Sequence, residues 1–175
     1  MKTKSEIRSY CKKKRDGFSA EEIANASEKV LKNITQSNLD LRGKTIMAYN
    51  SIRGEINLAK LENLTDNKIY YPTIQNGKVV AKSENFKIGK FGISEPTSGE
   101  IDKNKIDICF IPGVAFSKNM QRIGFGKGFY DDFLNDFQGV KIGITYEEFL
   151  FENITGENFD IPMDIIITEK QIITK

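Results

Sequence analysis

The chain has 175 residues, the size of one domain, and is long enough to bury roughly two thirds of its unfolded surface in a core. It carries 26 Lys and Arg residues against 24 Asp and Glu residues, and the net charge of +2 is too small to indicate a nucleic-acid or membrane partner. Histidine is absent, which excludes Ser-His-Asp triads, Cys-His dyads and metal sites with histidine ligands.

The cysteines and the apolar segments indicate the compartment. Cys11 and Cys109 are too few for a zinc ribbon, and we expect both to be buried thiols. No apolar stretch approaches the roughly 20 residues that a membrane span requires, and the N-terminus has no signal-peptide hydrophobic region. We therefore expect a cytoplasmic protein without a membrane partner, built as a single domain over residues 1–175.

Two helices are predicted first along the chain. Residues 3–15 form one helix, and Gly17 supplies its stop. The second begins with a capping box, Ser19 with Glu22 three residues later, and apolar residues follow at 3.6-residue spacing. The basic residues of the first helix have two interpretations, a solvated helix face or a patch that binds RNA or a membrane surface.

After residue 44 the pattern changes to short apolar runs of strand length. The predicted strands lie at 45–50, 68–72, 78–83, 106–112, 140–146 and 163–169. Helical patterns at 55–64 and 128–137 separate several of them. Apolar strands that alternate with helices indicate an α/β fold of three layers, a mainly parallel sheet with helices on both faces. Such sheets bind ligands beyond the carboxyl ends of their strands.

Residues 86–105 are the longest connection without apolar periodicity. A connection of this length is more often functional than filler. We expect it to form a lid or an arm across the surface.

The stretch 112–134, PGVAFSKNMQRIGFGKGFYDDFL, contains three alternating glycines at 124–128 between a predicted strand and a predicted helix. Glycine lets phosphate oxygens approach the backbone without a Cβ in the path, and the N–H groups of a helix N-terminus attract anions. Arg122 and Lys127 add cationic donors. The spacing matches neither the P-loop nor the G-x-G-x-x-G pattern, so a phosphate site outside those two classes is predicted.

Alternative interpretations remain for this stretch. Glycines at a strand–helix turn also serve tight packing, but their coincidence with Arg122, Lys127 and Asp131 favours a ligand site. Asp131, in the first turn of the predicted helix, either complements the helix dipole or binds Mg²⁺ on the phosphates.

The same stretch resembles the 5-formyltetrahydrofolate cyclo-ligase family, also called methenyltetrahydrofolate synthetases. Its members carry a segment similar to PGvaFd..G.RLGyGkGyYDr.L. The matching residues of this chain are Pro112, Gly113, Phe116, Arg122, Gly124, Gly126, Gly128, Tyr130, Asp131 and Leu134. The resemblance spans nearly the whole chain, because it includes the K-x-x-x-R of Lys4 and Arg8, AYNSIRGEIN, ISEP and FDIPMDIIITEK.

The resemblance implies an activity and a set of ligands. The family converts 5-formyltetrahydrofolate to 5,10-methenyltetrahydrofolate with ATP, and releases ADP and phosphate. Its fold is similar to the CoA-transferase and ribose-phosphate-isomerase group. ATP as co-substrate and Mg²⁺ are therefore the expected cofactors, and a reduced folate and a nucleotide are the expected partners, with no nucleic acid. We expect a monomer or a weak homodimer.

The resemblance also implies roles for individual residues. Lys127 and Arg122 are the implied catalytic residues. The implied ATP-binding residues are Lys4, Arg8, Arg122, Gly124, Phe125, Gly126, Lys127, Gly128, Phe129 and Tyr130. Asn50 and Glu55 are the implied folate-binding residues. The alternative for Glu55 is an acidic residue at a helix N-terminus. Asp131 and Asp160 are the implied Mg²⁺ ligands. Candidates for stacking on the folate rings, with core packing as the alternative, are Tyr70, Tyr71 and Phe91.

The chain departs from the family pattern at four positions. Ser117 and Met120 stand where Asp and Gly are usual, which affects the shape of the loop before Arg122. Phe149 and Phe159 replace polar residues of the family, which affects substrate contacts. The phosphate and metal residues match.

Other functions remain as alternatives. A sugar-phosphate isomerase or a CoA-transferase-like enzyme of the same fold would work without ATP. A nucleotide- or folate-binding protein without turnover would keep the ligand contacts alone. An RNA-binding module would use the basic N-terminus, but no RNA-recognition pattern is present.

Overall fold

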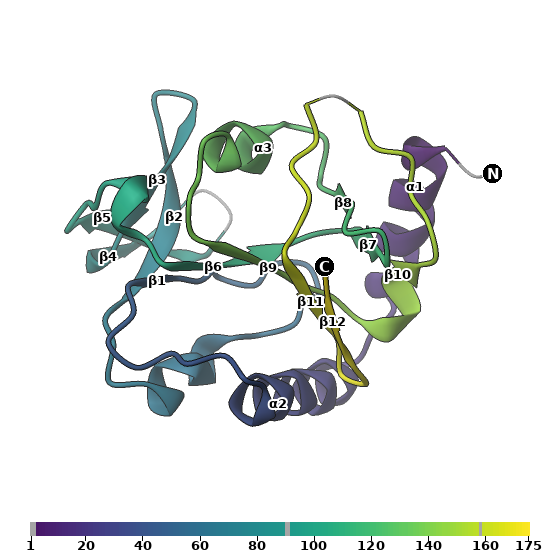
Figure 1. Cartoon of the computed structure of the whole chain (residues 1–175), viewed down its shortest axis with the longest axis horizontal. Coiled ribbons are helices and arrows are strands. Elements are labelled where there is room, and N and C mark those ends of the chain that lie inside the picture. The colour runs from purple at the N-terminus through teal and green to yellow at the C-terminus, as the bar shows by residue number, and fades with distance from the viewer. Residues whose placement is uncertain (1–2, 90–91, 158) are drawn as a thin grey trace.

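A seven-stranded sheet forms the centre of the molecule (Figure 1). The computed structural model describes residues 3–89, 92–157 and 159–175. In spatial order the strands are β12 (Ile172–Thr174), β11 (Ile165–Ile167), β9 (Val140–Ile144), β6 (Ile108–Pro112), β1 (Ile46–Met47), β2 (Ile69–Gln75) and β3 (Lys78–Lys82). Pairing is parallel from β11 to β2, and the edge strands β12 and β3 are antiparallel. The prediction of a mainly parallel sheet is therefore confirmed.

Within the described residues, three α-helices pack around this sheet, namely α1 (Lys4–Arg15), α2 (Ala20–Gln36) and α3 (Phe129–Leu134). The predicted capping box of Ser19 and Glu22 is present at α2, and Thr3 with Glu6 forms a second one at α1. Figure 1 shows α2 on one face of the sheet, α3 on the opposite face, and α1 beside the C-terminal part of the chain. Helices thus cover both faces, as predicted.

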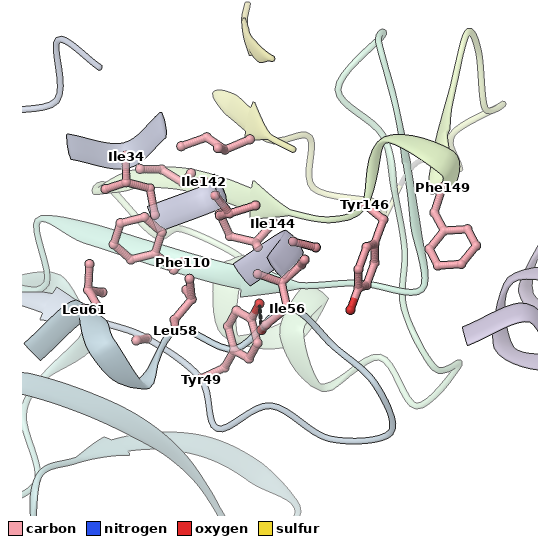
Figure 2. Close-up of a cluster of buried hydrophobic side chains, with 14 of the residues drawn as sticks. Ile34, Tyr49, Ile56, Leu58, Leu61, Phe110, Ile142, Ile144, Tyr146 and Phe149 are labelled. Atoms are coloured by element: carbon pink, nitrogen blue, oxygen red, sulfur yellow. Dashed lines mark hydrogen bonds between the residues drawn. The ribbon is translucent and has the colours of Figure 1, made fainter. Parts of the chain in front are cut away.

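Alternate residues of β6 supply the two halves of the core. Ile108 and Phe110 pack in the cluster that contains the buried residues of α2, whereas Cys109 and Ile111 pack with those of α3. Figure 2 shows the first cluster, in which Phe110 lies close to Ile34 of α2. Each large side chain in these clusters contributes about 2 kcal/mol through its removal from water. The unbroken apolar run of β6 therefore reflects burial on both faces.

Two smaller sheets lie outside the predicted elements. One consists of β10 (Leu150–Phe151), β7 (Ala115–Ser117) and β8 (Arg122–Ile123), and it fixes the course of the glycine-containing stretch. The other is a hairpin of β4 (Glu84–Ile88) and β5 (Ser94–Ser98). The remaining short elements are the 3-10 helices η1 (Ala59–Leu64), η2 (Lys103–Lys105) and η3 (Glu147–Phe149).

Two predictions of secondary structure are wrong. Residues 86–105 are not an irregular connection, because much of this segment belongs to the antiparallel hairpin of β4 and β5; every residue of β4 is exposed, so the sequence shows no apolar periodicity there. The role of this segment as a lid or a surface arm stays a prediction. The segment 55–64 is helical only as the 3-10 helix from residue 59. Residues 55–58 are irregular, although Glu55, Ile56 and Leu58 are buried. Phe91 lies outside the described residues.

Other predictions agree with the structure. Cys11 and Cys109 are both buried. Tyr71 is buried and donates to Glu62 at 2.7 Å, so its hydroxyl is engaged within the protein. Among the helices that the structure describes, none has the length and apolar character to cross a bilayer.

Candidate active site

The glycine turn, residues 124–128, lies between β8 and α3, next to the end of β6. Val114, just after β6, donates its N–H to the Ile123 carbonyl at 2.7 Å. This bond fixes β8 beside the carboxyl end of the central strand. The turn therefore lies where α/β sheets bind ligands.

The backbone of this turn is in conformations that favour glycine. Gly126 has φ 96° and Gly128 has φ 70°. Gly128 is the N-cap of α3 and has no side chain to cap the helix. A Cβ at Gly128 would meet no atom within 4 Å, so glycine is required here by the left-handed backbone and not by crowding. The turn thus exposes bare backbone at the start of α3.

Helix α1 brings two of the predicted ATP-binding cations to this region. Arg8 donates from Nε to the Gly124 carbonyl at 2.8 Å. Lys4 bonds to Asp160 and donates to Glu157 at 2.9 Å. Burial alone would lower the pKa of Lys4, but its bonds to Asp160 and Glu157 outweigh burial and raise that pKa. The structure thus connects helix α1 to the turn and to Asp160.

Arg122 and Tyr130 form a buried polar group behind the turn. Arg122 donates from Nη2 to Asp131 at 2.9 Å, and its guanidinium lies 5.5 Å from the Tyr130 ring centroid. The Arg122 Nε and the Tyr130 hydroxyl are buried, and neither has a hydrogen-bond partner in the described part of the chain. Burial raises the pKa of Tyr130 well above its usual value, so the hydroxyl is a neutral donor. Buried donors without acceptors are costly, and a bound ligand would relieve this cost.

Lys127 differs from the other cations of the site because it is exposed. Its Nζ lies 5.9 Å from the Phe129 ring centroid. In residues 3–89, 92–157 and 159–175, no carboxylate forms an ion pair with it. Its ammonium group is therefore available to an anion at the turn.

The residues predicted to bind folate lie in the irregular segment after β1. The side-chain amide of Asn50 donates to the Ser94 carbonyl at 2.6 Å. Glu55 is only 5% exposed and accepts from the Ile52 N–H at 3.0 Å through Oε2, while Oε1 has no hydrogen-bond partner among the residues described. Burial raises the pKa of Glu55 to about 7, against the attraction of Arg15 at 3.9 Å.

The two predicted metal ligands are engaged in separate ion pairs. Asp131 is paired with Arg122, and Asp160 with Lys4. The described residues contain no group of three or more acidic or cysteine side chains placed to hold a metal ion. A preformed metal cage is therefore not found in this part of the chain, and a Mg²⁺ site at these two carboxylates stays a prediction.

Comparison with known proteins decides the family. The model of the 5-formyltetrahydrofolate cyclo-ligase family matches residues 1–169. The chain belongs to this family. The predicted resemblance is thereby confirmed, and the predicted cyclo-ligase activity agrees with the family's name.

Individual relatives agree with this assignment. The 5,10-methenyltetrahydrofolate synthetase of Aquifex aeolicus superposes with a TM-score of 0.84 and 33% identity, over 98% of this chain and 92% of that one. The 5-formyltetrahydrofolate cyclo-ligase of Haemophilus influenzae is 28% identical over 94% of this chain and 97% of its own length. The match to the probable cyclo-ligase of Schizosaccharomyces pombe, at 31% identity, covers 55% of each chain, so there the chain spans about half of its relative.

Sequence reasoning missed Arg15 as a member of the site. Arg15 is buried, lies within 3.9 Å of Glu55, and its guanidinium is 5.4 Å from the Phe125 ring centroid. It follows Arg8 by seven residues, so both lie on one face of α1. The seven-residue spacing could have indicated that Arg15 lies near Arg8. The lysines around it made this part of α1 resemble a solvent-exposed helix face.

Proposed function

We propose that this chain catalyses the ATP-dependent conversion of 5-formyltetrahydrofolate into 5,10-methenyltetrahydrofolate, with release of ADP and phosphate. Membership of the cyclo-ligase family and the names of its relatives support this reaction. The structural observation that carries the proposal is the glycine turn. Left-handed backbone, Arg8 at the Gly124 carbonyl and the exposed Lys127 together suit a triphosphate.

The chemical problem is the loss of the formyl oxygen. Transfer of the γ-phosphoryl group to that oxygen forms an O–P bond and breaks the bond to ADP. The N10 lone pair then attacks the formyl carbon, the C–O bond breaks, phosphate leaves, and N10 loses its proton. Because phosphate leaves far more easily than hydroxide, the protein's contribution is mainly positioning and charge stabilisation.

The nucleotide side of the proposed site consists of α1 and the glycine turn. Lys4 and Arg8 reach the nucleotide from α1, and the backbone around Gly126 and Gly128 cradles its phosphates. Lys127 contacts the transferred phosphoryl group, where its charge stabilises the transition state. Arg122, with its unsatisfied Nε, adds a second donor behind the turn.

Two carboxylates suit a magnesium ion that arrives with the nucleotide. Mg²⁺ prefers oxygen ligands and usually binds through one or two carboxylates together with phosphates and waters. Asp131 and Asp160 are such ligands. Before a metal ion binds, their negative charges are balanced by the ion pairs with Arg122 and Lys4. When bound, the ion would neutralise charge on the phosphates.

The folate side of the proposed site consists of Asn50 and Glu55. A carboxylate can accept two parallel N–H bonds from the edge of a pterin ring. The unsatisfied Oε1 of Glu55 supports this role, because a buried acceptor without a partner gains most from a ligand.

A spectrophotometric assay with MgATP and 5-formyltetrahydrofolate tests the proposal. We expect methenyl absorbance and ADP to appear in equal amounts, and neither to form when ATP or the folate is omitted. Methenyl formation that does not need ATP, or ATP hydrolysis without folate turnover, would refute it.

A further inference from the structure

A buried ion pair connects the nucleotide-binding helix to the folate side of the site. Arg15 and Glu55 are 4% and 5% exposed, and their nearest atoms, Nη2 and Oε1, lie 3.9 Å apart. This separation is too long for a hydrogen bond, so the attraction between the two groups is electrostatic. In the low-dielectric interior such an attraction is stronger than at the surface.

We propose that Arg15 is a positioning residue that keeps the Glu55 carboxylate ionised and oriented for the folate ring. The proposal rests on the function assigned to Glu55 above. It gives α1 two roles, because Arg8 near its middle contacts the glycine turn and Arg15 at its C-terminal end faces the Glu55 carboxylate.

Three segments pack against Arg15 and hold it in place. Arg15 donates from Nη1 to the Gly113 carbonyl at 3.2 Å, and the ring of Phe125 lies against the guanidinium. Gly54 packs so closely against the Cγ and the backbone carbonyl of Arg15 that a Cβ would come within 3.0 Å of both, and its φ of 71° favours glycine. The guanidinium is thus held by the residue after β6 and by the glycine turn, while the chain just before Glu55 packs against the Cγ and the backbone of Arg15.

The other groups that face Glu55 are tyrosines. Tyr49 donates to the Ile56 carbonyl at 2.8 Å, as Figure 2 shows, and Tyr146 donates to the Gly54 carbonyl at 2.8 Å. The Tyr130 hydroxyl is buried, and Glu55 contributes to the raised pKa of all three tyrosines. Arg15 is the cation that acts on Glu55 from within the described residues.

The ionisation state of Glu55 decides what it can bind. Only the carboxylate accepts two N–H bonds, since the protonated acid loses one acceptor site. Burial favours the protonated form and the Arg15 charge opposes it, so the pKa of Glu55 lies at about 7, where a small change in charge alters its protonation. Arg15 therefore controls folate binding near neutral pH without contacting the folate.

The main test compares the pH dependence of kcat/KM for the folate in the parent protein and in Arg15→Gln. We expect the acidic limb of the pH profile of kcat/KM to move to higher pH by about one unit in Arg15→Gln. On the acidic side, kcat/KM for the folate should fall approximately tenfold, and KM for ATP should change less. Arg15→Lys keeps a positive charge, so its limb should stay close to that of the parent. It also provides a folded variant if Arg15→Gln does not fold.

Two further variants separate this role from general damage. Lys13→Gln removes an exposed cation from the same helical turn and should leave the limb unchanged. In a Glu55→Gln background, Arg15→Gln should add no further pH shift, because the titrating group is absent. An unchanged limb in Arg15→Gln, or an equal shift in Lys13→Gln, would overturn the proposal.

A measurement without ligands distinguishes this inference from the proposed function. In the parent protein, the unfolding free energy should fall with rising pH as Glu55 ionises. In Arg15→Gln this fall should continue to higher pH, and in Glu55→Gln it should be absent. If no protein turns over the folate, the proposed function fails, and the unfolding data alone decide the role of Arg15. If the unfolding free energy of Arg15→Gln depends on pH over a wider range than that of the parent, Arg15 controls the ionisation of Glu55. If the range is the same in both proteins, the inference is overturned.

Discussion

Around the glycine turn, Asp131 and Asp160 already bond to Arg122 and Lys4, whereas Glu55 faces its cation at 3.9 Å with one oxygen unsatisfied. The nucleotide side therefore holds charges in pairs that a ligand can exchange. The folate side holds a buried pair, Arg15 and Glu55, whose charges are only partly compensated. Water screens the first kind of interaction more strongly than the second.

This difference predicts two kinds of sensitivity. Substitution of the exposed Lys127 on the nucleotide side should mainly change turnover and leave folding intact, whereas Arg122 on the same side is buried. Substitutions on the folate side should change stability and pH dependence together, because desolvation dominates there. The predictions below test this division.

The largest effect is expected for Lys127→Ala. Loss of an ammonium directed at the transferred phosphoryl should lower kcat by about 10²- to 10³-fold. The unfolding midpoint should be unchanged, because Lys127 is exposed. Steady-state kinetics and thermal unfolding check both parts. Lys29→Ala removes an exposed ammonium from α2 and is the matched control. Near-normal turnover in folded Lys127→Ala would refute the assigned role.

The second effect concerns the pH dependence of stability. The pKa of Glu55 is raised from 4.5 to about 7 in the folded protein, so folding favours its protonated form. Its stabilising contribution is therefore complete below pH 4.5 and is lost as the pH rises to about 7, a change of about 3 kcal/mol. Urea unfolding across this range should show the loss in the parent and not in Glu55→Gln. Glu21→Gln, at an exposed position, should behave like the parent; if Glu55→Gln does so too, the assignment is wrong.

Local sequence signals predicted the elements that depend on neighbouring residues. The capping box at Ser19 and the 3.6-residue spacing after it located α2, and the unbroken apolar run located β6. The hairpin of β4 and β5 escaped prediction because β4 is exposed along its length, with Phe86 and Ile88 facing solvent. An exposed strand lacks the alternation that marks a half-buried one.

Apart from the family resemblance, the residues themselves indicated the candidate site only where a motif is contiguous. The stretch 112–134 indicated the glycine turn and its cations directly. The contact between Arg15 and Glu55 joins residues 40 positions apart, and the bond between Lys4 and Asp160 joins residues 156 apart. Burial of a charged residue depends on the completed packing, so spacing alone did not show that Arg15 belongs to the site.

A smaller effect is expected for Asp131→Asn. Loss of one negative ligand should raise the Mg²⁺ concentration for half-maximal activity roughly tenfold, equivalent to about 1.4 kcal/mol. The ion pair with Arg122 is also lost, so the change would extend to the polar group behind the turn. Asp132→Asn, at the exposed neighbouring position, is the control, and a Mg²⁺ titration of both variants is the measurement. Identical titrations would remove Asp131 from the metal site.

The smallest effect is expected for Gly128→Ala, which tests whether the bare backbone of the turn contacts the nucleotide. Alanine at φ 70° costs roughly 1 to 2 kcal/mol, and no steric clash adds to this because no atom lies within 4 Å of the new Cβ. Gly77→Ala is the matched control: Gly77 has φ 76° and equally open surroundings, but it lies in the turn between β2 and β3. Both variants should lose similar stability, and only Gly128→Ala should raise KM for ATP, because its Cβ stands where phosphate approaches the turn. Equal losses of stability with an unchanged KM in both would mean that the nucleotide side relies on side chains alone.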